Sequence, residues 1–371
     1  MVKDLAAVIS NFKIKGTYLS GKLSGYGHIN ESYLVYIRET DSPAYLLQWI
    51  NNSIFRDVEG LMKNFITVTS HLAGIADAWN DGNQFLEVIP TNDGLYYFVD
   101  ETGNYWRVFN FIAGSHVYDV VKEPGIACEG GKAFGQFLRQ VDGIPMESIS
   151  VTIPDFHNLE FRLNKFYNSV KADTKQRLKS ISQEIEFVNH HAEEMLVIPR
   201  LLGKGLIPQR ITHNDTKFNN IIFNAENKAI CIVDLDTVMP GSVLFDFGDA
   251  IRSGANTAAE DEQDLSKVTM DLNIFEAYAK GYLESTFDLL TQTELEMLAF
   301  SSRFMAFLIG LRFLTDFLDG DIYYRTQYPR HNLDRARVQF RLAESMEQQF
   351  PNMQNCIDKI AGNLKAKQNS H

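Results

Sequence analysis

The sequence predicts an α+β fold of two lobes, a small β-rich N-terminal lobe (residues 1–112) and a large helical C-terminal lobe (residues 113–371). Two observations support this division. Up to Ile112, short runs of alternating apolar and polar residues are separated by turn-forming residues, which is typical of strands. After Ile112 the apolar residues recur at helical spacing, with few strand signals. We therefore expect a cleft where the lobes meet, near residues 110–115.

The N-terminal lobe begins with the apolar spacing of a short helix over residues 1–10. Alternation then predicts two strands joined by a glycine turn within 17–38, and further strands over 44–50, 85–89, 96–99 and 106–112. One helix, 57–72, is expected among these strands because its apolar residues share a face: Val58, Leu61, Met62, Phe65 and Ile66.

The C-terminal lobe is predicted to be helical over 129–141, 156–170, 174–196 and from 245 to about 366, with a β interlude over 210–234. One long helix opens with a capping-box pattern, Thr291-x-x-Glu294. The most apolar stretch, 298–318, lies in the same helix and contains Arg303, Arg312 and Asp316. Because such charges are expensive in lipid, we expect a buried helix and not a membrane span.

Composition restricts the partners and the compartment. The chain is 45% hydrophobic and 22% charged, as globular proteins are, and its net charge of −12 argues against nucleic acid or an anionic membrane surface as a partner. The three cysteines are far apart, so neither a disulfide scaffold nor structural zinc is expected. The N-terminal residues lack an apolar signal core, and we expect a cytoplasmic protein.

The most informative motif lies in the β interlude, where His213, Asp215 and Asn220 follow the spacing His-x-Asp-x-x-x-x-Asn. Asp234 follows in the next strand-like run. Phosphoryl transfer needs an acidic group that orients the attacking hydroxyl, together with oxygen ligands for the Mg²⁺ that bridges the nucleotide phosphates. Asp215 is suited to the first task, and Asn220 with Asp234 to the second.

This order of lobes and motifs resembles the aminoglycoside phosphotransferase-type kinases, which share the protein-kinase architecture. The amino-acid sequences of three segments, 212–220, 233–241 and 245–249, most resemble those of the N-acetylhexosamine 1-kinases. The resemblance implies a protein-kinase-like two-lobed fold, the use of ATP and Mg²⁺, and transfer of the γ-phosphate to the anomeric hydroxyl of GlcNAc or GalNAc.

The resemblance also implies roles for individual residues. Asp215 corresponds to the catalytic carboxylate, and Lys217 to a lysine that reaches the γ-phosphate. Asn220 and Asp234 correspond to the metal ligands, and Asp246 to an aspartate that holds the catalytic loop.

Two further polar residues of these motifs have alternative interpretations. His213 is expected to brace the catalytic loop and not to carry a proton. For Asp236 we favour a capping or network carboxylate over a second metal ligand.

For the nucleotide, Gly25, Gly27 and Asn30 lie in a turn that resembles the family's phosphate-covering loop, and backbone groups of Asn110 and Ile112 are expected to bind adenine. The next strand departs from the pattern. Kinases usually carry a lysine there that pairs with the phosphates, whereas this chain has Gln48. Lys22 could compensate, although a solvated strand lysine is the simpler interpretation, and Glu59 is left without the usual lysine partner.

For the acceptor, Asn214, Thr237 and Arg312 are the candidate ligands. Arg312 lies in an apolar helix, so it must pair with Asp316 one turn later, contact a ligand, or do both. Tyr323 and Tyr324 could add a wall for a sugar ring. An arginine favours a neutral acceptor over a cationic one, since an aminoglycoside or choline would need an acidic or aromatic cage. The alternatives are a kinase for one of these acceptors or for another sugar, and a catalytically silent nucleotide- or sugar-binding module.

Overall fold

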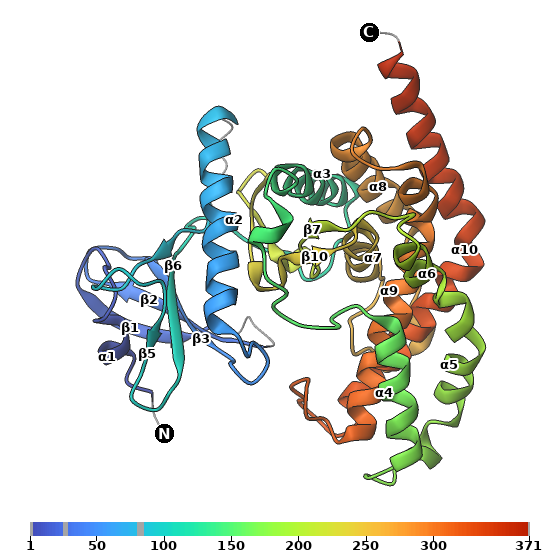
Figure 1. Cartoon of the computed structure of the whole chain (residues 1–371), viewed down its shortest axis with the longest axis horizontal. Coiled ribbons are helices and arrows are strands. Elements are labelled where there is room, and N and C mark those ends of the chain that lie inside the picture. The colour runs from blue at the N-terminus through green and yellow to red at the C-terminus, as the bar shows by residue number, and fades with distance from the viewer. Residues whose placement is uncertain (1–2, 25–28, 80–84, 370–371) are drawn as a thin grey trace.

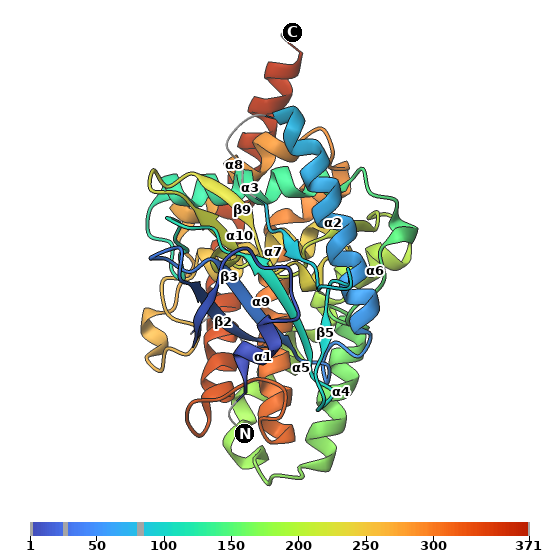
Figure 2. The same ribbon diagram turned by 90° about the vertical axis from the view of Figure 1, so that its left-hand side faces the viewer.

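An antiparallel sheet of six short strands forms the N-terminal lobe in the computed structural model, which describes residues 3–24, 29–79 and 85–369. The strand order is β1-β2-β3-β6-β4, and β5 also pairs with β6. Figure 2 views the molecule from the side of this lobe. The bounds are β1 Tyr18–Leu23, β2 Glu31–Ile37, β3 Tyr45–Ile50, β4 Val88–Ile89, β5 Phe98–Val99 and β6 Tyr105–Asn110. The predicted β-rich lobe is confirmed, although β4, β5 and β6 are shorter than expected.

The two faces of this sheet are covered by different helices. The outer face, with Leu47, Trp106 and Val108, forms a core with the short helix α1 (Leu5–Ile9). The long helix α2 (Val58–Trp79) lies between the sheet and the C-terminal lobe (Figure 1). Since side chains alternate along a strand, the neighbours of Trp106 and Val108 on β6 point toward α2 and the cleft.

One hydrophobic core is shared between the lobes. Apolar residues of α2, such as Leu61 and Phe65, cluster with Phe137 of α3 and with Leu235 and Met239 from the segment after the catalytic motif. The catalytic segment therefore packs directly on the helix of the N-terminal lobe.

Helices make up most of the C-terminal lobe, as predicted. They are α3 (Pro124–Val141), α4 (Leu159–Ala172), α5 (Ser182–Met195), α6 (Val197–Gly203), α7 (Val243–Gly254), α8 (Leu272–Thr286), α9 (Gln292–Asp319) and α10 (His331–Gln368). The single helix expected over 174–196 was wrong. Asp173 and Gln176 adopt positive φ angles of 37° and 54°, which end α4 and delay the next α-helix to Ser182.

Helix α9 begins with the predicted capping box. The Thr291 side chain accepts a hydrogen bond from the Glu294 N–H (3.2 Å), and the Glu294 carboxylate accepts one from the Thr291 N–H (2.7 Å). By length and composition α9 could span a membrane, but 94% of its most apolar window is buried inside this fold. It packs mainly against α10, α7 and α4, which confirms the predicted buried helix.

Two glycines allow α3 and α8 to cross closely. A Cβ at Gly131 would collide with the Tyr278 carbonyl, and a Cβ at Gly281 would collide with the Cys128 carbonyl. The close crossing fixes α3, whose Phe134 and Phe137 form part of the support of the catalytic loop.

The predicted β interlude consists of two small hairpin-like sheets that hold the motif. Strand β7 (Arg210–Thr212) pairs with β10 (Met239–Gly241), and β8 (Ile221–Phe223) pairs with β9 (Ala229–Ile232). The 3₁₀ turns η3 (Phe218–Asn220) and η4 (Leu235–Thr237) carry the remaining motif residues. The catalytic loop therefore runs from β7 to η3, with Asp234 directly before η4.

Candidate active site

A buried carboxylate holds the catalytic loop. Asp246, in the first turn of α7, accepts hydrogen bonds from the backbone N–H groups of His213 (2.9 Å) and Asn214 (2.7 Å). The Thr216 hydroxyl donates to the Asp246 carbonyl at 2.5 Å. These contacts match the bracing role expected for Asp246, and they fix the backbone on both sides of Asp215.

Two histidines brace the loop further. His213 is fully buried between Phe134 and Phe137, and its ring contacts the Val233 carbonyl through Nε2 (3.0 Å) and the Asp215 N–H through Nδ1 (3.3 Å). Burial lowers the pKa of His213, so the ring stays neutral, with Nε2 as the donor and Nδ1 as the acceptor. His157, whose pKa is lowered to about 3 by burial and by Arg312, donates to the Asn214 carbonyl (2.9 Å).

Asp215, Lys217 and Asn220 converge on one point. The Asp215 carboxylate lies 3.3 Å from the Lys217 ammonium and accepts a hydrogen bond from the Asn220 amide at 3.2 Å. Burial opposes the charge on Asp215, but the nearby Lys217 ammonium outweighs it and lowers the pKa of this carboxyl. The same partnership raises the pKa of Lys217 against the effect of burial. Both groups are therefore charged near pH 7.

Asp234 lies in the same charge cluster. It adopts a left-handed backbone conformation (φ 60°), and its neighbour Val233 donates its N–H to the Asn220 carbonyl (2.9 Å). Asp234 is itself exposed to solvent, but desolvation by the surrounding protein and repulsion from Asp236 and Asp215 raise its pKa to about 7. A non-glycine residue in this conformation is often held there for function.

The oxygens of this cluster fit a hard divalent cation. In the described part of the chain, neither the Asp234 carboxylate nor Oδ1 of Asn220 has a hydrogen-bond partner, and the neighbouring carboxylates repel each other. A cation on Asp234 and Asn220 would satisfy these oxygens and remove the repulsion. Few protein ligands and oxygen donors are typical of Mg²⁺ sites.

Two of the predicted acceptor ligands have other contacts. Asn214 is buried, and its amide donates to the carbonyls of Thr212, Thr237 and Met239 (3.0–3.2 Å). Thr237 is also buried, and its hydroxyl donates to the His213 carbonyl at 2.7 Å. Both side chains stabilise the loop from within, so the prediction that they contact the acceptor is corrected.

The predicted nucleotide residues are partly outside the described structure. Gly25 and Gly27 lie outside the described residues. The side chain of Asn30 is buried in a network, where its amide donates to Asp236 (2.7 Å) and its oxygen accepts the Asn51 N–H (2.9 Å). The Asn30 side chain is therefore not free for phosphate, and the expected contact between the backbone of this loop and phosphate stays a prediction.

At the hinge, the structure leaves only part of the expected backbone available. The N–H of Asn110 donates to the Glu87 carbonyl (3.1 Å) and its amide donates to the Phe85 carbonyl (3.1 Å). The N–H of Ile112 has no hydrogen-bond partner among the described residues, while its carbonyl accepts the Ser115 hydroxyl. The Ile112 N–H is therefore the available donor for a base.

Gln48 lies on β3 at the position predicted to replace the usual lysine. Its side chain does not point to an open site, because it is hydrogen-bonded to Arg107 of β6 and to Ser32 of β2. Arg107 forms a buried ion pair with Asp236 (2.6 Å). Asp236 is thus a network carboxylate, the interpretation favoured above. Lys22 lies over the Tyr36 ring, 5.0 Å from its centroid, where a solvated strand lysine is expected.

On the acceptor side, Arg312 does not pair with Asp316. The Asp316 carboxylate instead accepts the N–H groups of Ile322, Tyr323 and Tyr324 (2.8–3.0 Å) and so shapes the loop after α9. Arg312 is 8% exposed, has no hydrogen bond among the described residues, and lies over the Phe156 ring at 4.7 Å. The predicted ion pair was wrong, and the Arg312 donors remain available.

Arg312 borders a cavity of about 20 Å³ between α4, α9 and the loop after α9. Its lining is Arg162, Lys165, Arg312, Thr315, Asp316, Tyr323 and Tyr324. A larger cavity, of about 50 Å³, lies between α2, α3 and β9, and its lining includes Ile232 and Leu235 on either side of Asp234. Burial opposes the charge on Arg312, but Tyr324, Tyr323 and the charge of Asp215 outweigh it and raise the pKa of Arg312.

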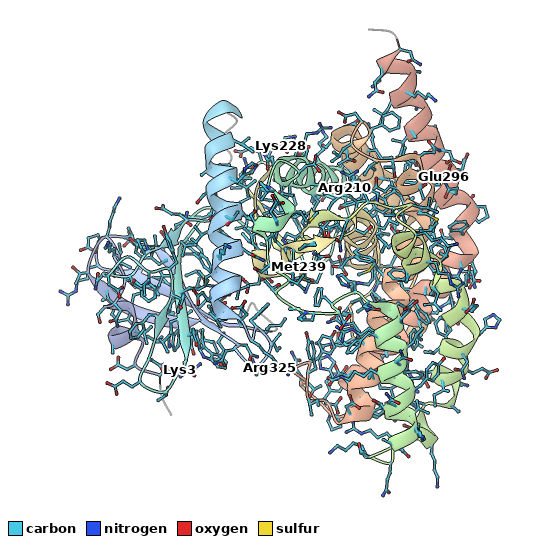
Figure 3. All side chains as sticks on the ribbon, in the orientation of Figure 1. Lys3, Arg210, Lys228, Met239, Glu296 and Arg325 are labelled. Atoms are coloured by element: carbon cyan, nitrogen blue, oxygen red, sulfur yellow. The ribbon has the colours of Figure 1, made fainter. Side chains whose placement is uncertain are left out.

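A second group of charged side chains lies beside Asp215 and Lys217. Arg252 pairs with Asp249 (2.7 Å) and Glu260 (3.3 Å), and the charges of Arg252 and Asp249 act on Asp215. Across the cleft, Arg325 at the tip of the loop after α9 extends toward the N-terminal lobe (Figure 3). The pKa of Glu31 on β2 is lowered by its hydrogen bond with Lys3 and also by the charge of Arg325.

Comparison with known proteins agrees with this geometry. The sequence model of the phosphotransferase enzyme family (APH) matches residues 35–283, which is more than half of the chain. The chain belongs to this family. It is an ATP-dependent phosphotransferase that acts on a small molecule.

Solved structures share the fold of this APH-family chain at low identity. An aminoglycoside phosphotransferase from Alicyclobacillus acidocaldarius is 12% identical, with 98% of this chain and 95% of that chain covered and a TM-score of 0.54. A choline kinase from Cryptosporidium parvum is 13% identical (94% and 96% covered, TM-score 0.58). The amicoumacin kinase hAmiN is 11% identical (93% and 92% covered, TM-score 0.59). These likenesses confirm the kinase-like α+β fold.

Several residues of this APH-family site were not predicted from the sequence. Arg107 and Arg162 each carried a usable signal, a charge inside an apolar strand or helix face. The Asp249–Arg252 pair has the i,i+3 spacing of a helical ion pair. His157 carried no signal, because its contact with Asn214 joins segments that are 57 residues apart.

Proposed function

We propose that the protein transfers the γ-phosphate of ATP to the anomeric hydroxyl of an N-acetylhexosamine, GlcNAc or GalNAc. The class of reaction follows from the family, and the acceptor is our inference. One observation carries it. Arg312 is buried on the acceptor side with unused hydrogen-bond donors, in a pocket whose carboxylate, Asp316, is already fully engaged.

This arrangement supports a neutral, oxygen-rich acceptor. The rings of Phe156, Tyr323 and Tyr324 surround the Arg312 guanidinium at 4.7–5.8 Å, so the aromatic cage that could bind an ammonium group already holds a cation. Hydroxyl and acetamido oxygens can accept from the guanidinium, whereas a cationic acceptor would be repelled. Among neutral, oxygen-rich acceptors, the sequence motif around Asp215 supports the N-acetylhexosamines.

Asp215 and Lys217 are suited to the chemistry. The ionised Asp215 carboxylate accepts a hydrogen bond from the acceptor O1–H and orients O1 toward the γ-phosphorus. A bond forms from O1 to the γ-phosphorus as the bond to the bridging oxygen of ADP breaks, and the O1 proton passes to Asp215 or solvent. Lys217 offsets charge on the transferred group. Mg²⁺, held by Asp234 and Asn220, would supply further charge compensation at the phosphates.

The test is ADP release with MgATP and a panel of acceptors: GlcNAc, GalNAc, unacetylated hexoses, choline and an aminoglycoside. We expect turnover with GlcNAc or GalNAc, and phosphorus NMR should place the product phosphate on O1. A product phosphorylated on O6, or turnover only with amines, would overturn the acceptor assignment. No turnover with any acceptor, despite measurable ATP binding, would favour a silent binding module.

The matched control is Asp215→Asn, which keeps the size and removes the charge. Turnover should fall by orders of magnitude while nucleotide affinity stays within about twofold. Wild-type turnover in this variant would exclude the role of Asp215.

A further inference from the structure

Arg107 is a fully buried charge at the centre of the N-terminal sheet. It lies on β6 and points toward α2, with 1% of its surface exposed. Its guanidinium lies over the rings of Phe65 (5.2 Å) and Phe109 (4.9 Å). A buried arginine needs an opposite charge and satisfied donors, so its partners indicate what it does.

The partner of Arg107 belongs to the other lobe. Arg107 Nη1 lies 2.6 Å from Asp236 Oδ1, and Nη2 lies 2.6 Å from Asp236 Oδ2, a two-point contact between planar groups. Asn30 adds a third contact to Asp236 (2.7 Å). Asp236 lies in the turn η4, two residues after the candidate metal ligand Asp234. The ion pair therefore connects the N-terminal sheet to the segment that presents Asp234.

Gln48 completes the arrangement from the position where kinases usually have a lysine. Its oxygen accepts from Arg107 Nε (2.9 Å) and Nη2 (2.5 Å), and its amide donates to the Ser32 hydroxyl (2.9 Å). A lysine at position 48 would place a second cation against the guanidinium. Gln48 and Arg107 thus form one unit that excludes the usual lysine.

We propose that Arg107 is a positioning residue for the metal–nucleotide site, and that the Gln48–Arg107–Asp236 unit replaces the lysine usually found on this strand. The buried cation does not touch the nucleotide. It neutralises Asp236 and fixes η4, so that Asp234 faces Asn220 in its left-handed conformation. The inference rests on the use of ATP and Mg²⁺ and not on the identity of the acceptor.

The test measures binding of ADP with Mg²⁺ by calorimetry, which needs no acceptor, together with kinetics. Arg107→Met keeps the length of the side chain and leaves Asp236 unpaired. We expect the Mg²⁺ concentration for half-maximal ADP binding to rise about 10- to 100-fold, as when groups behind metal ligands are removed. The KM of the acceptor should change less than about twofold, since the pair lies away from the acceptor pocket.

Two further variants separate positioning from simple folding. Arg107→Met combined with Asp236→Asn removes both charges, and it should recover part of the thermal stability that Arg107→Met alone loses, but not the Mg²⁺ affinity. Gln48→Lys, which restores the usual kinase residue, should weaken ADP–Mg²⁺ binding and not strengthen it.

Arg210→Met is the matched control, because Arg210 is also paired with a buried carboxylate, Glu294 (3.1 Å), but within the C-terminal lobe. It should lower the melting temperature and leave the Mg²⁺ requirement unchanged. The proposal is overturned if Arg107→Met behaves like Arg210→Met, or if Gln48→Lys binds ADP–Mg²⁺ more tightly than the wild-type protein.

Discussion

Asp246→Asn tests whether the position of Asp215 depends on the carboxylate that holds the catalytic loop. The two hydrogen bonds at 2.9 and 2.7 Å come from consecutive backbone N–H groups, those of His213 and Asn214. An asparagine has the same shape but can accept only one of them, because its amide nitrogen meets the other N–H as a second donor. One hydrogen bond is lost and one buried donor is left unpaired.

The expected loss of stability is about 2–4 kcal/mol, the usual range for such a change. For a chain of this length, an unfolding entropy of about 2.1 cal/mol/K per residue converts that loss to a fall of about 3–5 °C in the melting temperature. Turnover should fall by about 100-fold, because losing this brace lets Asp215 shift, and a shift of about 1 Å in a catalytic group has an effect of that size. Nucleotide affinity should change little.

Thermal unfolding, ADP binding and steady-state turnover together decide the outcome. Asp316→Asn is the matched control, since Asp316 likewise accepts several backbone N–H groups but shapes the loop that carries Tyr323 and Tyr324. It should raise the acceptor KM and leave kcat within about threefold of wild type. If Asp246→Asn melts earlier but turns over at the wild-type rate, the loop does not depend on this brace.

Three other outcomes are expected. Asp234→Asn should abolish turnover yet raise the melting temperature of the protein in EDTA by about 1–2 °C at pH 8, because it removes repulsion with Asp236 and Asp215. Since the pKa is raised from 3.8 to about 7 in the folded state, the loss of stability is absent below about pH 4, grows between pH 4 and 7 and is complete above pH 7, so a gain that persisted at pH 4 would contradict this cause. Arg312→Met should raise the acceptor KM at least tenfold with unchanged ADP affinity, and a changed ADP affinity would place Arg312 elsewhere. Gly131→Ala should lower the melting temperature by several degrees because its Cβ collides with the Tyr278 carbonyl; an unchanged value would show that α3 and α8 can separate freely.

The sequence predicted those parts of the site that are local in the chain. Asp215, Lys217 and Asn220 lie within six residues, so one loop can bring them together. Side-chain direction within that loop was not predictable. Asn214 is next to Asp215 but points inward, because its positive φ of 63° turns it toward three carbonyls.

Contacts between distant segments explain the remaining differences. Arg107 and Asp236 are separated by 129 residues, and the sequence around neither residue predicts that the two will pair. Arg312 and Asp316 have the spacing of a helical ion pair. Asp316 instead accepts three hydrogen bonds from backbone N–H groups of the following loop. Helical spacing predicts contacts between residues of the same helix. It does not predict contacts with the loop that follows the helix and folds back on it.

The apolar surface of α9 has a consequence for biosynthesis. Its largest packing partner, α10, follows it in the chain, so a nascent polypeptide emerges from the ribosome with the α10-facing side of α9 uncovered. Until α10 leaves the exit tunnel, this apolar side of α9 faces water, and it is then a natural target for a chaperone. A ribosome that stalls within α10 would therefore release a product prone to aggregation.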